Sequence, residues 1–263
     1  MEKTPHPAFA RLVEIMATLR SPNGCPWDRE QTTDSLTPYL IEETYEVLEA
    51  LETKDWPAFK EELGDLLLQI VFHAQLMAEA GIFTIDDVAQ AIADKLVRRH
   101  PHVFGDVKVK DAGEVVQNWV KIKAAEKAGK TDRSILAGVP HSAPALIQAQ
   151  RLGEKAARVG FDWTAAAEVF KKVEEETQEL AATLPTQDVE QQEHELGDLL
   201  FALTSLARHL NLDAETALRK AGKRFNDRFR YLEARLTQNG EDIHHTSPLR
   251  LEELWQEAKR ALG

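Results

Sequence analysis

The chain has 263 residues, of which 43% are hydrophobic and 29% charged, with a formal net charge of −12. This composition supports one large or two ordinary folded domains, and the acidic balance disfavours nucleic-acid binding. A single cysteine excludes an internal disulfide framework and favours a reducing compartment, so we expect a cytoplasmic protein. No apolar run predicts a membrane span or an amino-terminal signal peptide.

The hydrophobic pattern predicts helices along almost the whole chain and no strand. Asp34 or Ser35, Asp55 and Thr84 are the expected amino-terminal caps of three of them. The Gly, Pro and Ser residues of 129–143 predict an interdomain linker. The expected helices are 7–20, 34–53, 56–80, 85–100, 111–128, 144–158, 165–184, 188–210, 213–238 and 249–261. We therefore predict an all-α protein with helical domains at 1–128 and 144–263.

Two acidic motifs occur twice at one constant spacing, which is the strongest signal in the sequence. EETYE at 42–46 returns as EETQE at 175–179, and ELGDLLLQ at 62–69 returns as ELGDLLFA at 195–202. The repeated acids are Glu42, Glu43, Glu46, Glu62 and Asp65 in the first copy and Glu175, Glu176, Glu179, Glu195 and Asp198 in the second. Such self-similarity predicts two copies of one helical unit.

The spacing within each copy places carboxylates on shared helix faces. Residues three apart lie on one side of a helix, so Glu176 and Glu179 form one pair. Glu195 and Asp198 form a second pair, and the turn at 184–188 folds the two helices into a hairpin in which the pairs can meet. Crowded carboxylates repel one another unless a cation lies between them. Hard oxygen ligands without Cys or His favour Mg²⁺, with Mn²⁺ as a possible substitute.

The second helix of this hairpin also carries leucines at helical spacing. We expect Leu196, Leu199, Leu200 and Leu203 to form its core stripe, with the carboxylates at the edge of that stripe.

Basic and aromatic residues in the second copy could contact a nucleotide. Lys172 lies one turn before Glu176, where it could reach a phosphate or pair with that glutamate. Arg224 and Arg228 lie one turn apart and could hold a phosphate. Trp255 could stack on a base or pack the last helix. The related positions in the first copy are Lys95, Arg99 and Trp119.

These motifs, in this order, resemble the MazG family of the all-α NTP pyrophosphatase superfamily. The segments that carry the resemblance are GCPWD (24–28), EETYE with ELGDLL, RRHPHVF (98–104), GFDW (160–163), and EETQE with ELGDLLF. They extend over nearly the whole chain. The resemblance implies two four-helix-bundle-like units, a homodimer with sites near subunit contacts, and Mg²⁺-dependent cleavage of a nucleoside triphosphate (NTP) between its α and β phosphates. The products would be a nucleoside monophosphate (NMP) and pyrophosphate.

The resemblance also implies a role for individual residues. The metal ligands would be Glu176, Glu179, Glu195 and Asp198. The residues lining the nucleotide site would be Lys172, Glu175, Arg224, Arg228 and Trp255. A metal-activated water would attack the α-phosphorus, and we expect Glu175, which lies beside the ligands, to take its proton.

The two copies differ in a way that favours the second as the catalytic one. Tyr39 stands at the position that corresponds to Lys172, and the basic helix of the first copy ends at Pro101. The residues of the first site, which is not the favoured catalytic site, are Glu42, Glu43, Glu46, Glu62, Asp65, Lys95, Arg99 and Trp119.

Three alternatives stay open at this point. The first is a relative with a narrower substrate, namely dUTP, dCTP or phosphoribosyl-ATP. The second is a ferritin-like di-iron bundle, which would need Glu-x-x-His on two helices where this chain has Glu-x-x-Glu and Glu-x-x-Asp. The third is a non-catalytic helical module that binds a basic partner through its acidic faces. Neither the preferred base nor any protein partner follows from the sequence.

Overall fold

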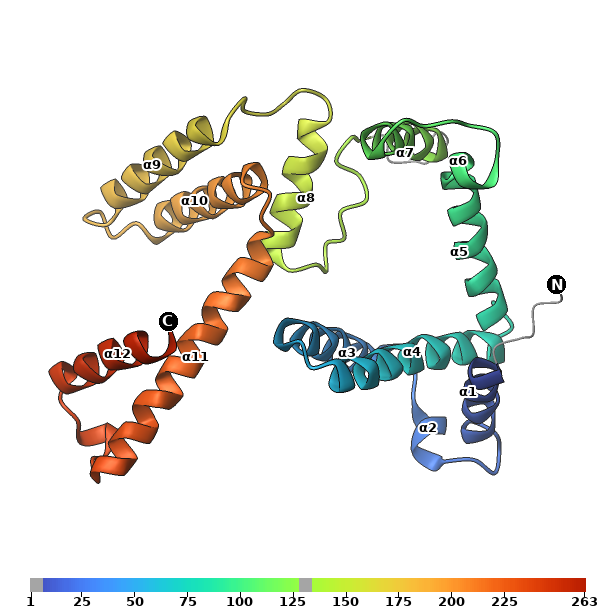
Figure 1. Ribbon diagram of the computed structural model, residues 1–263, viewed down its shortest axis with the longest axis horizontal. Coiled ribbons are helices and arrows are strands. Elements are labelled where there is room, and N and C mark those ends of the chain that lie inside the picture. The colour runs from blue at the N-terminus through green and yellow to red at the C-terminus, as the bar shows by residue number, and fades with distance from the viewer. Residues whose placement is uncertain (1–6, 128–133) are drawn as a thin grey trace. The chain divides into compact units, whose positions relative to one another are not determined.

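The computed structural model describes residues 7–127 and 134–263, and within these ranges every regular element is a helix. The chain divides into two compact units, Met1–Ala128 and Gly129–Gly263, each of which contains one acidic repeat (Figure 1). The predicted all-α tandem repeat is therefore confirmed. Part of the predicted linker, residues 129–133, lies outside the described residues. None of the described helices combines the length and the apolarity that a membrane span requires.

The first unit is organised around a helical hairpin. Its helices are α1 (Pro7–Leu19), α2 (Pro26–Glu30), α3 (Thr33–Thr53), α4 (Trp56–Glu79), α5 (Ile85–Arg99), α6 (Pro101–Phe104) and α7 (Ala112–Lys127). Helices α3 and α4 pack side by side, and α1 packs on α4. The core between these three helices consists of Met16, Leu36, Val71 and Phe72, each at most 3% exposed.

Local sequence signals explain where the hairpin helices begin and end. Lys54 adopts a left-handed conformation that ends α3. The Asp55 carboxylate then accepts a hydrogen bond from the Ala58 amide at 3.1 Å and caps α4, as predicted. The predicted cap of α3 was wrong, because Thr32 caps this helix and forms a reciprocal capping box with Ser35. The segment before it, where no helix was expected, contains the short helix α2.

The second unit repeats this hairpin and adds a second one. Its elements are α8 (Ala145–Ala157), α9 (Ala166–Thr183), α10 (Val189–His209), α11 (Ala214–Asn239), the short 3₁₀ helix η1 (Ile243–His245) and α12 (Pro248–Leu262). Helices α9 and α10 form the hairpin that corresponds to α3 and α4, and α8 packs on α10 as α1 packs on α4. Helices α11 and α12 form the second hairpin.

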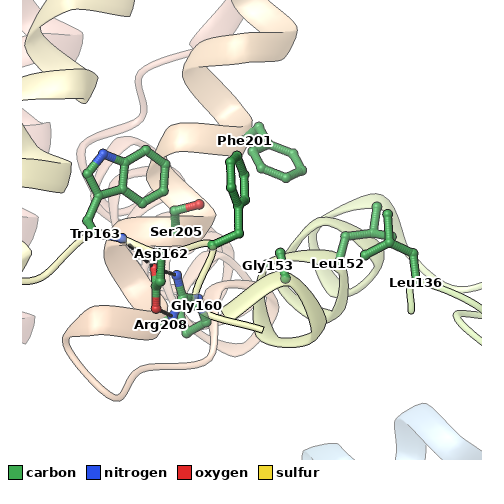
Figure 2. A pocket seen from close by; sticks show the side chains of 11 residues that line it. Leu136, Leu152, Gly153, Gly160, Asp162, Trp163, Phe201, Ser205 and Arg208 are labelled. Carbon is green, nitrogen blue, oxygen red and sulfur yellow. Dashed lines mark hydrogen bonds and ion pairs between the residues drawn. The ribbon is translucent and has the colours of Figure 1, made fainter. Parts of the chain in front are cut away.

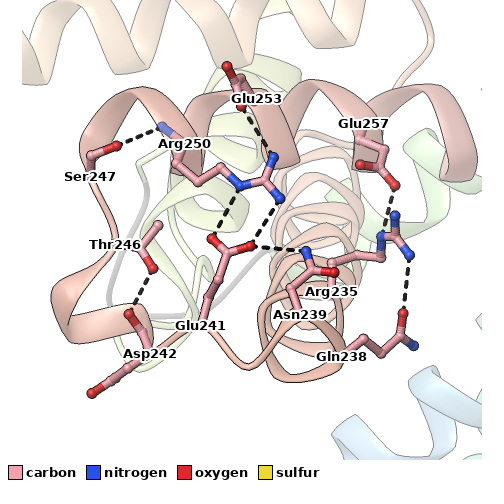
Figure 3. A network of polar contacts seen from close by, with 10 residues as sticks. All are labelled: Arg235, Gln238, Asn239, Glu241, Asp242, Thr246, Ser247, Arg250, Glu253 and Glu257. Atoms are coloured by element: carbon pink, nitrogen blue, oxygen red, sulfur yellow. Dashed lines mark hydrogen bonds and ion pairs between the residues drawn. The ribbon is translucent and has the colours of Figure 1, made fainter.

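Polar contacts connect α11 and the turn that follows it to α12 (Figure 3). Arg250 on α12 reaches back to Glu241, which follows α11, with an Nη2–Oε1 distance of 3.1 Å. Arg235 on α11 contacts Glu257 on α12 at 3.0 Å. Beneath these ion pairs lies a small apolar core, which consists of Leu232, Leu236 and Leu254. The second hairpin is therefore stabilised by its own contacts.

The leucine stripe of α10 does not lie where the sequence predicted. Leu196, Leu200 and Leu203 are 47%, 44% and 42% exposed and Leu199 is half-buried, whereas the buried residues of α10 are Ala202, Thr204 and Ser205. The expectation of a core stripe was wrong because α9 and α8 cover other faces of the helix. The matching residues of α4 are also exposed, and they are Leu63, Leu67 and Ile70. Both repeats thus carry the same uncovered apolar stripe, which we call the repeated stripe.

Candidate active site

Three carboxylates meet at the seam between α9 and α10. Oxygen atoms of Glu176, Glu179 and Glu195 all lie within 4.8 Å of one another. Glu176 and Glu179 lie one turn apart on α9, and Glu195 faces them from α10. The spacing of the acidic residues in the two motifs therefore brings these three side chains together. Glu176 is only 5% exposed, whereas Glu179 is exposed. The structure therefore brings together three of the four predicted metal ligands, and we call them the second-repeat triad.

A single lysine compensates part of this negative charge. The Nζ atom of Lys172 lies 2.7 Å from Oε1 of Glu175 and 2.7 Å from Oε1 of Glu176. These two carboxylates raise the pKa of Lys172 well above its ordinary value, so it stays charged. Desolvation, together with the nearby negative charge of Glu176, raises the pKa of Glu179. The seam thus retains uncompensated negative charge near Glu179.

One oxygen atom of the second-repeat triad lacks a hydrogen-bond partner among the described residues. Oε2 of Glu176 is buried and has no hydrogen-bond partner among the described residues. Leaving a buried carboxylate oxygen unpaired costs free energy, so such an atom indicates a missing ligand. Hard oxygen donors in a group of this size suit Mg²⁺ or Mn²⁺. The residues present therefore fit a divalent cation.

The fourth predicted ligand, Asp198, lies outside the triad. Its side chain is 51% exposed, and its Oδ2 atom lies 3.4 Å from Nε2 of His194. Asp198 follows Glu195 by three residues, so it remains one turn away on the same side of α10. The structure places it beside the triad rather than within it.

The predicted nucleotide contacts of the last hairpin, Arg224, Arg228 and Trp255, lie on α11 and α12. Arg228 donates from Nη2 to the carbonyl oxygen of Gly263 at 2.7 Å. The Trp255 ring packs against Phe225 at a centroid distance of 5.1 Å and against the small apolar core of that hairpin. No ion pair or hydrogen bond between described residues joins Arg224, Arg228 or Trp255 to the carboxylates of α9 and α10. Their role at the site stays a prediction.

The first repeat forms a similar but not identical acidic group. Oxygen atoms of Glu43, Glu62 and Asp65 lie within 4.8 Å of one another, and we call these residues the first-repeat triad. Desolvation and the charge of Asp65 raise the pKa of Glu43. Tyr39 occupies the position of Lys172, and its ring makes an edge contact with Trp27 at 6.1 Å. The first-repeat triad therefore lacks the lysine that flanks the second.

The other predicted residues of the first copy lie outside the first-repeat triad. Arg99 pairs with Glu126 at 2.5 Å, which joins α5 to α7. The Trp119 ring nitrogen donates to the carbonyl oxygen of Arg99 at 2.8 Å. Lys95 is exposed on α5, and Glu42 and Glu46 are not members of the first-repeat triad.

Sequence reasoning assigned no role to a cavity in the second unit. Residues from α8, α10 and the segment before α9 line a cavity of about 530 Å³ (Figure 2). Asp162 accepts two hydrogen bonds from Arg208, at 2.5 and 2.7 Å, and forms part of its wall. The GFDW motif at 160–163 carried the family resemblance, and its aromatic residues were the available signal for this cavity.

Comparisons with known proteins identify the family of this chain. The MazG nucleotide pyrophosphohydrolase domain matches residues 31–104 and 165–231, which contain the two hairpins. The chain is 47% identical to the nucleoside triphosphate pyrophosphohydrolase of Escherichia coli over 95% of this chain and 96% of that protein. It is 47% identical to the nucleoside triphosphate pyrophosphohydrolase/pyrophosphatase MazG of Thermotoga maritima over 95% of each chain.

A solved structure of a mazG-related protein from Thermotoga maritima is 28% identical and covers 43% of this chain and 97% of its own, with a TM-score of 0.38. The family assignment rests on the sequence matches, which include both repeats and nearly the whole chain. The chain therefore belongs to the MazG family of nucleotide pyrophosphohydrolases.

Proposed function

We propose that this protein is a Mg²⁺-dependent nucleoside triphosphate pyrophosphohydrolase whose active site is the second-repeat triad. It would convert an NTP and water into NMP and pyrophosphate, and Mn²⁺ would substitute for Mg²⁺. The observation that carries this proposal is the buried, unpartnered Oε2 of Glu176 beside two further carboxylates and a lysine. The names of the most similar relatives support the same reaction.

The carboxylates of α9 and α10 would bind the cation together. Glu176, Glu179 and Glu195 would hold the cation, and Asp198 would extend the site along α10. When bound, Mg²⁺ would lower the pKa of a water molecule and shield the negative charge of the phosphates. Glu176 is fixed by burial and by Lys172, so the position of at least one ligand is preorganised.

Lys172 and Glu175 would act next to the reacting phosphate. Lys172 stays protonated and can contact a phosphate oxygen as the substrate enters. Glu175 is more than half exposed and, within the part of the chain that the structure describes, pairs with Lys172 through Oε1, so its second oxygen can accept a proton from the attacking water. Arg224, Arg228 and Trp255 remain the proposed contacts of the last hairpin with the nucleotide.

A homodimer is part of this proposal, and the repeated stripe supports it. Leu196, Leu200 and Leu203 are each more than 40% exposed although they are large and apolar. Exposed apolar stripes of this kind indicate an association surface. Sedimentation of the protein should give the mass of a dimer, and Leu200→Asp should reduce it. A wild-type protein that sediments as a monomer would contradict the proposed dimer but would not bear on the proposed reaction.

The reaction itself is tested by its products. Incubation with Mg²⁺ and an NTP should yield NMP and pyrophosphate in equal amounts, with no nucleoside diphosphate (NDP). Hydrolysis in ¹⁸O-labelled water should place the label on NMP, because the α-phosphorus is attacked. Label in pyrophosphate, or early accumulation of NDP, would show attack at another phosphorus. No turnover of any NTP would favour a non-catalytic helical module.

A further inference from the structure

The hairpin of α9 and α10 ends differently from the hairpin of α3 and α4. The constant spacing of the repeats matches Thr53, the last residue of α3, with Thr186, yet α9 ends three residues earlier, at Thr183. Pro185 stands where the first repeat has Glu52. A proline has no amide hydrogen with which to continue a helix, so α9 cannot extend as far as α3 does. The second hairpin therefore has the longer turn between its helices.

The early end of α9 leaves carbonyl groups that the helix itself cannot pair, because the last four carbonyls of a helix lack partners within it. The Thr183 carbonyl oxygen accepts hydrogen bonds from the backbone amide of Thr186 at 3.0 Å and from its hydroxyl at 2.7 Å, both within the turn. The same oxygen accepts a third hydrogen bond from Nε2 of Gln192 at 3.1 Å. Gln192 belongs to α10, so this third bond joins the two helices. Thr183 is 2% exposed, which shelters the bond from water.

The first hairpin has different side chains at the matching positions. Phe59 corresponds to Gln192, and Ala50 corresponds to Thr183. A phenylalanine ring has no amide to donate, and the Phe59 ring instead makes an edge contact with Trp56 at a centroid distance of 6.2 Å. At these matched positions, the hydrogen bond between helices is therefore a feature of the second repeat.

The Gln192–Thr183 bond lies one turn from the second-repeat triad on both helices. Glu179 precedes Thr183 by four residues on α9, and Gln192 precedes Glu195 by three residues on α10. These intervals correspond to about 6 Å and about 4.5 Å along the helix axes. Because the two helices form a hairpin, the bond and the carboxylates occupy successive levels of one seam (Figure 1).

Of the two triad members on α9, Glu179 is the one nearer to this bond along the chain. Glu179 is exposed and lies one turn before the end of its helix. Helix ends fray where few contacts hold them, so the position of Glu179 depends on what fixes this end of α9 to α10. Its counterpart Glu46 lies about two turns before the end of α3 and is not a member of the first-repeat triad.

We propose that Gln192 is a positioning residue of the second-repeat triad, an inference that rests on the proposed function. Its bond to the Thr183 carbonyl holds the end of α9 against the start of α10 and so keeps Glu179 in the triad. The carboxylate of Glu179 would bind the cation, and Gln192 acts on it through the backbone of α9. When the end of α9 is released, two carboxylates remain in place of three, and a divalent cation is bound less tightly.

The test measures the binding of a metal ion without any nucleotide. Gln192→Met removes the donor and keeps the length of the side chain. The Thr183 carbonyl keeps both of its bonds from Thr186, so this variant is expected to fold. The probe is Mn²⁺ alone, titrated into the full chain and followed by electron paramagnetic resonance and by calorimetry. All proteins in the titration carry Glu43→Gln, which removes one charge from the first-repeat triad, and the protein with this change alone is the parent.

A second glutamine of the same unit provides the matched control. Nε2 of Gln148 donates to the carbonyl oxygen of Ala143 at 2.7 Å, in a bond that is also half-buried. Gln148 lies on α8, which carries no member of the triad. Gln148→Met therefore removes the same kind of hydrogen bond from a part of the unit that does not hold the carboxylates.

Gln192→Met is expected to weaken Mn²⁺ binding by about 2- to 13-fold, which is the value of one neutral hydrogen bond when all of its free energy acts on the site. Gln148→Met should leave the affinity unchanged, even where it lowers the melting temperature. A double variant gives the sharper result. In a protein that already carries Glu179→Gln, Gln192→Met should weaken binding by less than about twofold, because the two changes act on the same ligand.

Several results would overturn the inference. Unchanged Mn²⁺ affinity in Gln192→Met would do so, as would an equal loss in Gln148→Met or full additivity with Glu179→Gln. A parent protein that binds no Mn²⁺ would overturn it as well.

These results can be told apart from a failure of the proposed function. Unchanged Mn²⁺ affinity in Gln192→Met, together with normal release of pyrophosphate by the wild type, would refute the positioning role alone. Selective weakening of Mn²⁺ binding, with no release of pyrophosphate from any NTP by the wild type, would instead refute the proposed reaction and keep Gln192 as a positioning residue of a metal site.

Discussion

The two repeats have the same helical hairpin and the same acidic motif, yet they surround that motif with different side chains. Glu176 in the second repeat is 5% exposed, has an unpartnered oxygen and is paired with Lys172. The first repeat has Tyr39 at the position of that lysine, and Tyr39 contacts Trp27 instead. Duplication of the motif therefore preserved an acidic group between the two hairpin helices without preserving the charge around it.

The triads also differ in membership. Asp65 belongs to the first-repeat triad, whereas its counterpart Asp198 lies outside the second and faces His194. Glu179 joins the second-repeat triad, whereas its counterpart Glu46 does not join the first. Small differences in side-chain direction thus decide which acids meet. Four pairs of measurements test whether this comparison reflects two different functions.

The largest difference is expected between Glu176→Gln and Glu43→Gln. The first change neutralises the buried ligand of the second-repeat triad, so pyrophosphate release should fall by at least about 100-fold, because loss even of outer partners of a metal site costs about 10- to 100-fold. The second change should alter the rate by less than about threefold. Similar losses in both variants would mean that the two sites work together.

The next largest difference in activity is expected between Asp198→Asn and Asp65→Asn. Asp198→Asn keeps the size of a side chain that extends the site, so turnover should fall by about 10- to 100-fold with the helical circular-dichroism signal intact. Asp65→Asn should leave most of the activity, although Asp65 is a member of its triad. Loss of activity from Asp65→Asn alone would reverse the assignment of the catalytic repeat.

The third difference concerns metal binding without turnover. Mg²⁺ at about a hundredfold excess over its dissociation constant should stabilise the second unit by about 2.7 kcal/mol, because the ion binds only the folded site. Glu176→Gln should abolish this increase in melting temperature, and Glu43→Gln should retain it. Identical melting curves of the wild type with and without Mg²⁺ would count against a preformed metal site.

The smallest difference is one of acid sensitivity. Hydrogen bonds from Arg208 hold the pKa of Asp162 far below its usual value, so this pair stabilises the folded state above about pH 4 and loses its effect as the pH falls further. Asp162→Asn should lower the free energy of unfolding at pH 7 by about 1–3 kcal/mol, since the pair is mostly buried. The same variant should show a smaller loss of stability on acidification.

A matched change in the first unit provides the comparison. Hydrogen bonds from Arg99 and Arg98 lower the pKa of Glu126 to about 2, with the same sign of pH dependence. Arg98 is 56% exposed, so Glu126→Gln should destabilise the protein less than Asp162→Asn does. Urea unfolding at pH 7 and at pH 3 measures both effects. A greater effect of Glu126→Gln would show that the first unit depends more on its ion pairs.

Several features of this protein follow from short-range sequence signals. Helix periodicity, the caps at Asp55 and Thr84 and the constant spacing of the acidic motifs predicted the tandem helical units and the pairing of Glu176 with Glu179. These signals act within one or two helical turns, where side-chain direction depends on the local backbone. The family resemblance likewise rests on the order of the sequence motifs and not on contacts between helices.

Other features depended on which helices pack together. The sequence alone could not show that Leu196 and Leu200 stay exposed, because the apolar period of a helix does not reveal which partner covers it. Nor could it show the cavity that Phe201 and Ser205 line, since a cavity depends on how residues distant in sequence pack. Sequence determined the helices and the acidic motif, and tertiary packing decided which acids meet and where a cavity lies.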